Sequence, residues 1–256
     1  MRIATWNVNS LKIRLPRVEE WLRYAAPDVV CLQETKLADA AFPALAFEAL
    51  GYRSAHHGRG QWNGVAILSR VGLEDVVDGF CTGVEADQDT RLISATCGGV
   101  RVSSVYAPNG RSVGSDHYEY KLSWFDRLHR HLEVTCDPGD PVAVCGDFNI
   151  APEDRDVWDP GAFVGATHVS QPERQALARL HQWGLVDAFR VRHQEDRLYT
   201  YWDYRAGDFH MHRGMRIDLV LATKVLADTV RLALVDRNAR KGKLPSDHAP
   251  LLIDLG

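Results

Sequence analysis

The chain has 256 residues, of which 45% are hydrophobic and 25% charged, and its formal net charge is -4. This length supports a substantial buried core, and the composition is typical of a folded globular protein. No apolar run reaches the roughly eighteen residues of a membrane-spanning helix, and the first residues form no apolar signal segment, so we expect a cytoplasmic protein. The weak negative charge neither indicates nor excludes nucleic acid, because local charge matters more than the sum.

Short apolar runs rich in Val, Ile, Leu and Thr recur along the whole chain and predict β-strands. They occupy residues 2–8, 28–34, 64–70, 91–97, 100–108, 141–149, 217–223 and 249–255.

Segments with helical periodicity lie between some of these runs, at residues 15–28, 118–134 and 171–184. In the first segment the apolar residues follow an i, i+3, i+4, i+7 pattern, which predicts one buried helix face. Pro16 suits the first turn of this helix and Pro27 its end, and Gly184 is a plausible stop for the third helix. The residues of the first apolar face are Val18, Trp21, Leu22 and Ala25.

The order of the elements is mixed, because several strands follow one another before helices return. This order disfavours a simple alternating βαβ fold and favours an α/β architecture of two packed sheets with helices outside. No linker or low-complexity tract interrupts the sequence, so we expect a single domain over residues 1–256. The stretches "TWNVN" and "GDFNIAP" both end a strand with an Asn, which weakly suggests an internal repeat with a site at its junction.

The five cysteines have no CxxC spacing, and Cys31, Cys97 and Cys145 lie within apolar runs. We expect reduced core thiols rather than disulfides or a thiolate metal site.

Polar side chains lie at or near the ends of six of the predicted strands, which are far apart in sequence. Strands of a packed sheet bring such ends together, and functional sites commonly form there. These residues are Asn7, Asn9, Glu34, Tyr106, Asn109, Asp147, Asn149, Asp218, Asp247 and His248.

Each of these residues also has a structural interpretation. Asp147 fits ordinary turn chemistry, and Glu34 fits a helix cap or an ion pair with Lys36. Asp218 is less easily explained, because a carboxylate within an apolar run needs a partner when it is buried, and His248 is a candidate. The joint occurrence of all these residues favours a reaction centre.

This set of side chains fits metal-assisted hydrolysis of a phosphoester. Glu34, Asn7, Asn9 and Asp247 offer hard oxygen ligands, which suit Mg²⁺ (or Mn²⁺) better than zinc. An Asp–His pair can orient an imidazole toward a phosphate or water, while amides and a phenol can bind phosphate oxygens. A Ser-His-Asp acyl hydrolase fits poorly, because GxSxG is absent.

The motifs "WNVNS", "LQETK", "YAPNG", "GDFNIAP", "RIDLVLA" and "SDHAP", in this order, resemble the exonuclease/endonuclease/phosphatase superfamily. The similarity runs from residue 1 to residue 256 and is greatest to apurinic/apyrimidinic endonucleases of the exonuclease III type. The resemblance implies a four-layered α/β sandwich and a Mg²⁺-dependent cut 5′ to an abasic site in double-stranded DNA. It also implies 3′→5′ exonuclease activity and 3′-phosphatase or phosphodiesterase activity on blocked 3′ ends.

The resemblance further implies roles for single residues. Glu34 would be the principal metal ligand, with Asn7, Asn9 and Asp247 near the metal. Asp147 would position or deprotonate the attacking water, and Asn149 would bind a phosphate oxygen. Asp218 would orient His248 toward the phosphate, while Tyr106 and Asn109 would hold the phosphate or the leaving oxygen. Whether Asp147 or His248 is the general base stays open at this point.

Two further groups of residues are predicted to contact DNA. The resemblance places Tyr201, Trp202, Met215 and Ile217 around an apolar sugar pocket, with core packing as the alternative. Basic residues near the site would bind backbone phosphates. For those in the run 237–243, the alternative is a solvated turn. These basic residues are Arg91, Lys121, Arg216, Arg237, Arg240, Lys241 and Lys243.

Two rival functions remain at this stage. One is a related phosphoesterase that acts on RNA, uridine-containing DNA, a phospholipid or an inositol phosphate. The other is a catalytically silent DNA-binding module, which the complete polar set disfavours. No apolar seam is obvious in the sequence, and we expect a monomer.

Overall fold

The computed structural model describes residues 1–81 and 89–256. Its strands are β1 (Arg2–Asn7), β2 (Val29–Gln33), β3 (Arg53–His57), β4 (Val65–Ser69), β5 (Glu74–Asp78), β6 (Leu92–Cys97), β7 (Val100–Tyr106), β8 (Val142–Asp147), β9 (Leu185–Asp187), β10 (Asp218–Thr223), β11 (Val230–Val235) and β12 (Leu251–Leu255). The α-helices are α1 (Leu11–Ala25), α2 (Ala44–Glu48), α3 (Asp116–Thr135), α4 (Gln171–Trp183), α5 (Asp208–Met211) and α6 (Lys224–Ala227).

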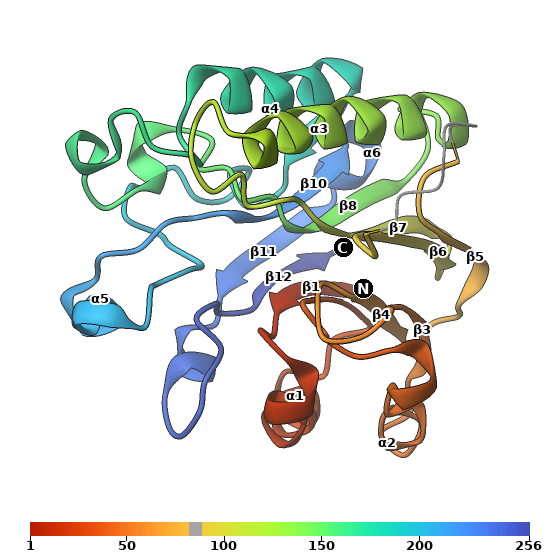
Figure 1. Ribbon diagram of the computed structural model, residues 1–256. Helices are drawn as coiled ribbons and strands as arrows, with labels where there is room; N and C mark the ends of the chain where they lie inside the picture. The colour runs from red at the N-terminus through yellow and green to blue at the C-terminus, as the bar shows by residue number, and fades with distance from the viewer. Residues whose placement is uncertain (82–88) are drawn as a thin grey trace.

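The strands form two six-stranded sheets, in the orders β11-β12-β1-β2-β4-β3 and β5-β6-β7-β8-β10-β9. Both sheets are mixed. In the described ranges each has one parallel pair, β1 with β2 and β7 with β8, and a helix connects the strands of each pair. The sheets pack face to face through β1 and β8, β2 and β7, and β4 and β6 (Figure 1). The expected α/β architecture of two packed sheets is confirmed.

Helices cover the outer face of each sheet, so the fold has four layers (Figure 1). The apolar face of α1 packs on β1, β2 and β4, while α3 and α4 pack on β7, β8 and β10. Between the sheets lies a third apolar layer to which both contribute. Because the inner strands are covered on both faces, they are buried along most of their length and rich in apolar residues, which explains why the sequence predicts them so clearly.

The first helix begins earlier than the sequence predicts. Its first turn closes on the carbonyl of Ser10, which accepts from the backbone N–H groups of Ile13 and Arg14. Pro16 therefore lies inside α1, more than one turn after its start, and its assignment to the first turn is wrong. The cause is local: Leu11 and Arg14 are buried and extend the packed face toward the N-terminus.

The other end signals agree better with the structure. Helix α4 begins with a capping box, in which Ser170 and Glu173 each bond the other's backbone N–H, and it ends at Gly184, whose φ is 130°. The expected stop at Gly184 is confirmed. Within the described ranges, the helices are too short or too polar to cross a bilayer.

Three of the five cysteines are core residues, while Cys81 is exposed and Cys136 is partly buried. In the described part of the chain all five are free thiols, and Cys31, Cys97 and Cys145 lie in the apolar layer between the sheets. Burial raises the pKa of the Cys31 and Cys97 thiols, which keeps them protonated and unreactive.

Candidate active site

Strand directions bring the predicted polar residues to one end of the two sheets. The parallel strands β1 and β2 finish side by side at Asn7 and Gln33, and β12 runs antiparallel to β1, so it starts at this end. In the second sheet Tyr106 and Asp218 are the direct register partners of Asp147 on either side. Directly paired residues point to the same face of a sheet, so these three side chains lie next to each other.

Asn7 links the two sheets at the centre of this group. Its side chain is fully buried, and its Nδ2 donates to Glu34 Oε1 at 2.8 Å and to Asp147 Oδ2 at 2.9 Å. Glu34 follows β2 directly and has a φ of 52°, a left-handed turn that leads the chain away from the sheet. One buried amide therefore fixes a carboxylate from each sheet at hydrogen-bonding distance.

A lysine ammonium lies among the oxygen atoms on the first sheet's side of the site. Lys36 Nζ is 2.8 Å from Glu34 Oε2 and 2.7 Å from Asn9 Oδ1, and Asn9 Nδ2 donates to Asp247 Oδ1 at 3.1 Å. Burial acts to raise the pKa of Glu34, but Lys36 and the hydrogen bond from Asn7 outweigh it and lower that pKa. The ion pair that the sequence offered as an alternative for Glu34 is therefore present.

The same contacts bear on metal binding. A cation already occupies the oxygens of Glu34 and Asn9 in the form of the Lys36 ammonium, so this donor set is suited to positive charge. Carboxylate and amide oxygens are the ligands that Mg²⁺ and Mn²⁺ prefer. A second group, Asp147, Asp218 and His248, places one ligand atom from each residue within 4.8 Å of the others and could also hold a metal ion.

His248 is held between two carboxylates. Its Nδ1 is 2.8 Å from Asp218 Oδ2, and its Nε2 is 3.8 Å from Asp147 Oδ2. Burial opposes the charged imidazolium, but the two carboxylates outweigh burial and raise the pKa of His248 to about 10. With that pKa the ring is a cation at neutral pH, and it would have to lose this proton before it could join Asp147 and Asp218 as a metal ligand.

For Asp147, burial outweighs the neighbouring groups that favour its charged form. Its side chain is buried, which raises its pKa to about 7 even though His248 and Asn7 lower it. Its Oδ1 accepts from the backbone N–H of Asn149 at 2.9 Å, across a turn in which Asn149 has a φ of 51°. A carboxyl with this pKa exchanges a proton near neutral pH, as a general base or acid requires.

Amide and phenol groups from β7 and the loop after β8 complete the site. Asn149 Nδ2 donates to the Ala107 carbonyl at 3.0 Å, and Asn109 Nδ2 donates to Asn149 Oδ1 at 3.3 Å. Burial and the nearby Glu34 raise the pKa of Tyr106, so its hydroxyl stays protonated and able to donate. All ten residues predicted to form the reaction centre therefore lie at this one end of the sheets.

A family model described as the Endonuclease/Exonuclease/phosphatase family matches residues 4–248, which include this whole group of residues. The chain belongs to this family. The exodeoxyribonuclease III of Haemophilus influenzae is 32% identical over 266 residues, covering 98% of each chain. An AP endonuclease from Archaeoglobus fulgidus is 37% identical with a TM-score of 0.96, covering 100% of this chain and 99% of the other.

A third relative has a structure with DNA. It is a 3′ phosphatase, NExo from Neisseria, bound to a product DNA hairpin; it is 39% identical with a TM-score of 0.95 and covers 100% of this chain and 99% of its own. Together with the family match, these relatives identify the chain as a nuclease of the exonuclease III type, and so as a phosphodiester hydrolase. The recognition made from the sequence motifs is confirmed.

Two basic residues of this nuclease that were predicted to bind DNA are buried, and the prediction is wrong for both. The Lys121 ammonium is buried against Glu173, 2.6 Å away. Arg216 is 1% exposed and pairs with Asp156 and Asp187, each at 2.7 Å. Both cations balance buried carboxylates, so neither can reach a backbone phosphate.

Arg240 and Trp202 are also interior residues. The Arg240 guanidinium donates to the carbonyls of Ser246 and Trp202 and so braces the turn before Asp247. Trp202 is fully buried and packs with Tyr199 and Ala249 rather than with the predicted sugar pocket. The predicted phosphate contact of Arg240 and the predicted pocket contact of Trp202 are therefore wrong.

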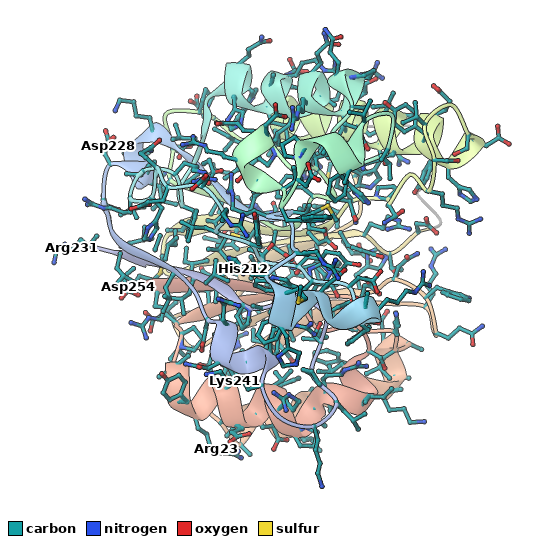
Figure 2. All side chains as sticks on the ribbon, turned by 90° about the vertical axis from the view of Figure 1, so that its left-hand side faces the viewer. Arg23, His212, Asp228, Arg231, Lys241 and Asp254 are labelled. Atoms are coloured by element: carbon teal, nitrogen blue, oxygen red, sulfur yellow. The ribbon has the colours of Figure 1, made fainter. Side chains whose placement is uncertain are left out.

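The remaining DNA-contact predictions fit the structure and stay predictions. Tyr201, Met215 and Ile217 pack in one apolar cluster, and the Tyr201 ring lies 4.9 Å from the His248 ring. Lys241 and Lys243 are exposed on the segment between β11 and β12 that follows η5 (Arg237–Arg240), and Figure 2 shows Lys241 beside α1. Exposed Arg237 lies over the Trp202 and Phe209 rings. Arg91 is partly buried over the Tyr106 ring at 4.7 Å.

Sequence reasoning missed one residue beside the site. His168 Nδ1 is 2.6 Å from the carbonyl of Asn149, and burial, with the Lys121 charge close by, lowers the pKa of His168 to about 4. The imidazole is therefore neutral at physiological pH. A single His in a polar loop carries no periodicity or motif that would have indicated this contact.

Proposed function

We propose that this nuclease is a Mg²⁺-dependent (or Mn²⁺-dependent) DNA-repair endonuclease that hydrolyses the phosphodiester 5′ to an abasic site. The observation that carries the proposal is the junction at Asn7, where an oxygen-rich cation site on one sheet meets the Asp147–His248 pair on the other. A phosphoester bound across this junction would meet positive charge on one side and a proton acceptor on the other.

Different residues of the site would bind the metal ion, stabilise the developing charge and hold the phosphate oxygens. Glu34, Asn9 and Asp247, with Asn7, would hold a divalent ion, which when bound would offset the charge on the phosphoryl oxygens. The His248 imidazolium, kept charged by Asp218, would contact a phosphate oxygen and stabilise the charge that develops there. The groups of Tyr106, Asn109 and Asn149 would hold the other phosphate oxygens or the leaving oxygen.

Asp147 is the better candidate for the general base. Its pKa lies near 7, whereas His248 with a pKa of about 10 already carries a proton at neutral pH. Asp147 is also fixed by Asn7 and by the backbone of Asn149, which leaves its orientation little freedom. It would take the proton of the attacking water while His248 stays cationic.

Selectivity for damage would come from the apolar cluster next to His248. Tyr201, Met215 and Ile217 pack there with Val157 and Phe163. A sugar without a base has no pairing or stacking of its own to lose, so it costs less to extrude from the duplex than a normal nucleotide. An apolar pocket for a flipped sugar would exploit this difference.

The test is incision of a synthetic duplex that carries one tetrahydrofuran abasic analogue. We expect a single cut 5′ to the analogue, loss of the cut in EDTA, and recovery with added Mg²⁺. Asp147→Asn should lower the rate by about 10²–10⁴-fold, while Asp228→Asn, at an exposed carboxylate directly after α6, should leave it unchanged. Cleavage of RNA or an inositol phosphate in preference to the abasic duplex would contradict the proposal.

A second activity is proposed on the likeness to the NExo 3′ phosphatase. The same site would remove a 3′-phosphate or a blocking sugar fragment, and would degrade strands from a 3′ end. Because both reactions attack a phosphorus held by the same groups, Asp147→Asn should slow both by a similar factor. A duplex with a recessed 3′-phosphate, assayed for phosphate release, tests this second activity. The cytoplasmic location and the monomeric state expected from the sequence stay predictions.

A further inference from the structure

A cleft opens next to the active site on the side of β7. It has a volume of about 420 Å³, and its lining includes Tyr106 and Asn109 of the site itself. From there it leads to residues with no role in the reaction proposed above, among them the exposed Trp62, Arg111 and His117. A volume of this size lies within the range of small-ligand sites, and its position makes it continuous with the place of the reacting phosphate.

The lining of the cleft includes an exposed tryptophan. Trp62 is 71% exposed, although tryptophan is usually well buried because its large apolar ring gains much from leaving water. An exposed indole at the edge of a cleft is a flat apolar surface available to a ligand. In nucleases and other single-strand binders, such rings serve as platforms on which bases stack.

The loop that carries Trp62 is fixed rather than free. The Thr35 N–H donates to the Gly64 carbonyl at 3.1 Å, the Lys36 N–H donates to the Asn63 carbonyl at 2.9 Å, and the Gly64 N–H donates to the Thr90 carbonyl at 3.0 Å. Gly64 has a φ of 91°, and a Cβ there would lie 2.2 Å from Thr35 Oγ1, so only glycine permits this approach. The loop is thus tied to the residue after Glu34 and to the residue before Arg91.

The other walls of the cleft carry positive and polar groups. The Arg91 guanidinium lies over the Tyr106 ring with its Nε 3.0 Å from Asp89, and Arg111 and His117 are exposed. Guanidinium and imidazole groups are suited to phosphate oxygens, which position a strand without reading its sequence. An exposed aromatic ring and such groups in the lining of one cleft match the two parts of a nucleotide, a flat base and an anionic phosphate.

We propose that this cleft is a nucleotide subsite, in which the base of a nucleotide flanking the scissile phosphate stacks on Trp62. The inference rests on the proposed function and adds a substrate preference to it. A base inside a duplex is already stacked on both faces and gains little from the indole. The subsite therefore favours DNA in which the flanking base is unstacked, as at a frayed or mismatched 3′ end, over DNA in which it is paired.

Binding in EDTA tests the subsite independently of cleavage. Two duplexes with the same length and label, one with a paired 3′-terminal nucleotide and one with a mismatched one, are titrated and followed by fluorescence anisotropy. The wild-type protein should bind the mismatched end more tightly. Trp62→Ala should weaken binding to the mismatched duplex about 5- to 100-fold, the worth of one base–aromatic stack, with little change for the paired duplex. Trp62→Phe should keep most of the preference.

Two controls separate stacking from charge and from loss of fold. Arg111→Ala should weaken both duplexes equally, because phosphate contacts do not sense base stacking. Tyr24→Ala removes an aromatic ring that is 74% exposed on α1, outside the cleft, and should change neither affinity. A wild-type protein without preference for the mismatched end, or a Trp62→Ala variant that keeps the preference, would overturn the subsite.

A different result would contradict the proposed function. That result is a wild-type protein that binds the abasic duplex but does not cut it when Mg²⁺ is present. Incision with no end preference in the binding assay leaves the function standing and removes the subsite. The two hypotheses can therefore be rejected separately.

Discussion

The Lys36 ammonium contacts the same oxygen atoms that are proposed to bind a metal ion. It contacts Glu34 Oε2 and Asn9 Oδ1, so it neutralises the site when no other cation is bound. The charge that stabilises the metal-free protein would therefore also compete with an ion bound at the proposed metal ligands, and the two effects can be measured separately.

Replacing Lys36 with Met should separate these effects. In EDTA the variant should lose about 1–3 kcal/mol of stability, because a largely buried carboxylate is left without its cation. With Mg²⁺ present, the thermal midpoint of Lys36→Met should rise more than that of the wild type, since the ion no longer displaces an ammonium. Thermal unfolding with and without Mg²⁺ measures both. Lys12→Met, an exposed lysine of α1, is the control, and an equal Mg²⁺ response in wild type and Lys36→Met would contradict the competition.

His131 makes stability depend on pH, because burial and the nearby Arg101 charge both oppose its protonation. It is 1% exposed on α3, its Nδ1 accepts from the Cys81 N–H at 3.2 Å, and burial lowers its pKa from 6.5 to about 4. Between these two pH values the unfolded chain binds a proton that the folded protein excludes. The stabilising effect is therefore complete above pH 6.5 and is lost as the pH falls toward 4.

The loss should amount to about 3 kcal/mol at most, at 1.36 kcal/mol for each unit of the pKa shift. His131→Gln, which keeps an acceptor for the Cys81 N–H, should unfold in urea with a smaller difference between neutral and acid pH. His129→Gln on the same helix removes a half-buried imidazole and should behave like the wild type. If wild type and His131→Gln lose the same stability on acidification, His131 is not the residue responsible.

At the residue scale, the sequence predicted which polar residues gather at one end of the sheets better than it predicted which basic residues are exposed. Strand ends converge by topology, so polar residues such as Asn7 and Asp147 could be grouped from their places at the ends of apolar runs. A basic residue shows its charge in the sequence but not its exposure. Lys121 and Arg216 are buried because Glu173 and Asp156 neutralise them, and those partners lie 52 and 60 residues away in sequence.

At the scale of elements, the strands that the sequence failed to predict are β3, β5, β9 and β11. They are the four edge strands of the two sheets. An edge strand has one hydrogen-bonded neighbour and more contact with water, so its sequence need not be continuously apolar. The burial patterns agree: β5 is exposed at four of its five positions, whereas β8 is buried at all six.

Helices α3 and α4 are joined to the site by one buried ion pair. Lys121 Nζ donates to Glu173 Oε1 and Asn149 O, each at 2.6 Å, and to Asn109 O at 3.2 Å. Glu173 also accepts from the Thr167 hydroxyl at 2.7 Å. The pair thus spans from two outer helices to the backbone of the two asparagines that are proposed to hold phosphate.

Breaking this pair from either side should be costly. Lys121→Met or Glu173→Gln should lose about 3–5 kcal/mol, because each leaves a buried charge without its partner, and the double variant should lose less than the sum. Urea unfolding of the three variants gives the coupling. The exposed pair Lys224–Asp228 is the control, and Lys224→Met should cost no more than about 0.5 kcal/mol. Additive losses in the double variant would show that the two charges do not act together.

At the scale of the whole molecule, the first sheet is built from both ends of the chain. β12 pairs with β1, the Met1 amino group donates to the Leu255 carbonyl at 3.0 Å, and the two termini lie close together in Figure 1. The Trp6 indole also donates to the His248 carbonyl, 242 residues away in sequence. The site therefore cannot form until the last strand is in place, and β12 is needed for function although it carries none of the site residues.

The net charge of -4 requires that DNA be bound through local groups of positive charge. Lys241 and Lys243 are exposed lysines shortly before Asp247 in sequence, and their loop is fixed because Arg17 donates to the carbonyls of both. Lys224 lies at the other end of β10 from Asp218, and so at the far end of the sheet from the site. Charge removal at these two places should have different effects on DNA binding.

Lys241→Ala with Lys243→Ala should weaken binding by a similar factor for every DNA sequence. It should also lower the slope of log affinity against log salt by about one for each phosphate that the variant no longer neutralises. Affinities measured in EDTA at several salt concentrations give this slope, and Lys224→Ala should leave it at the wild-type value. A double variant with an unchanged slope would mean that these lysines face solvent in the complex, and the phosphates would then have to be held by the cleft cations Arg91 and Arg111.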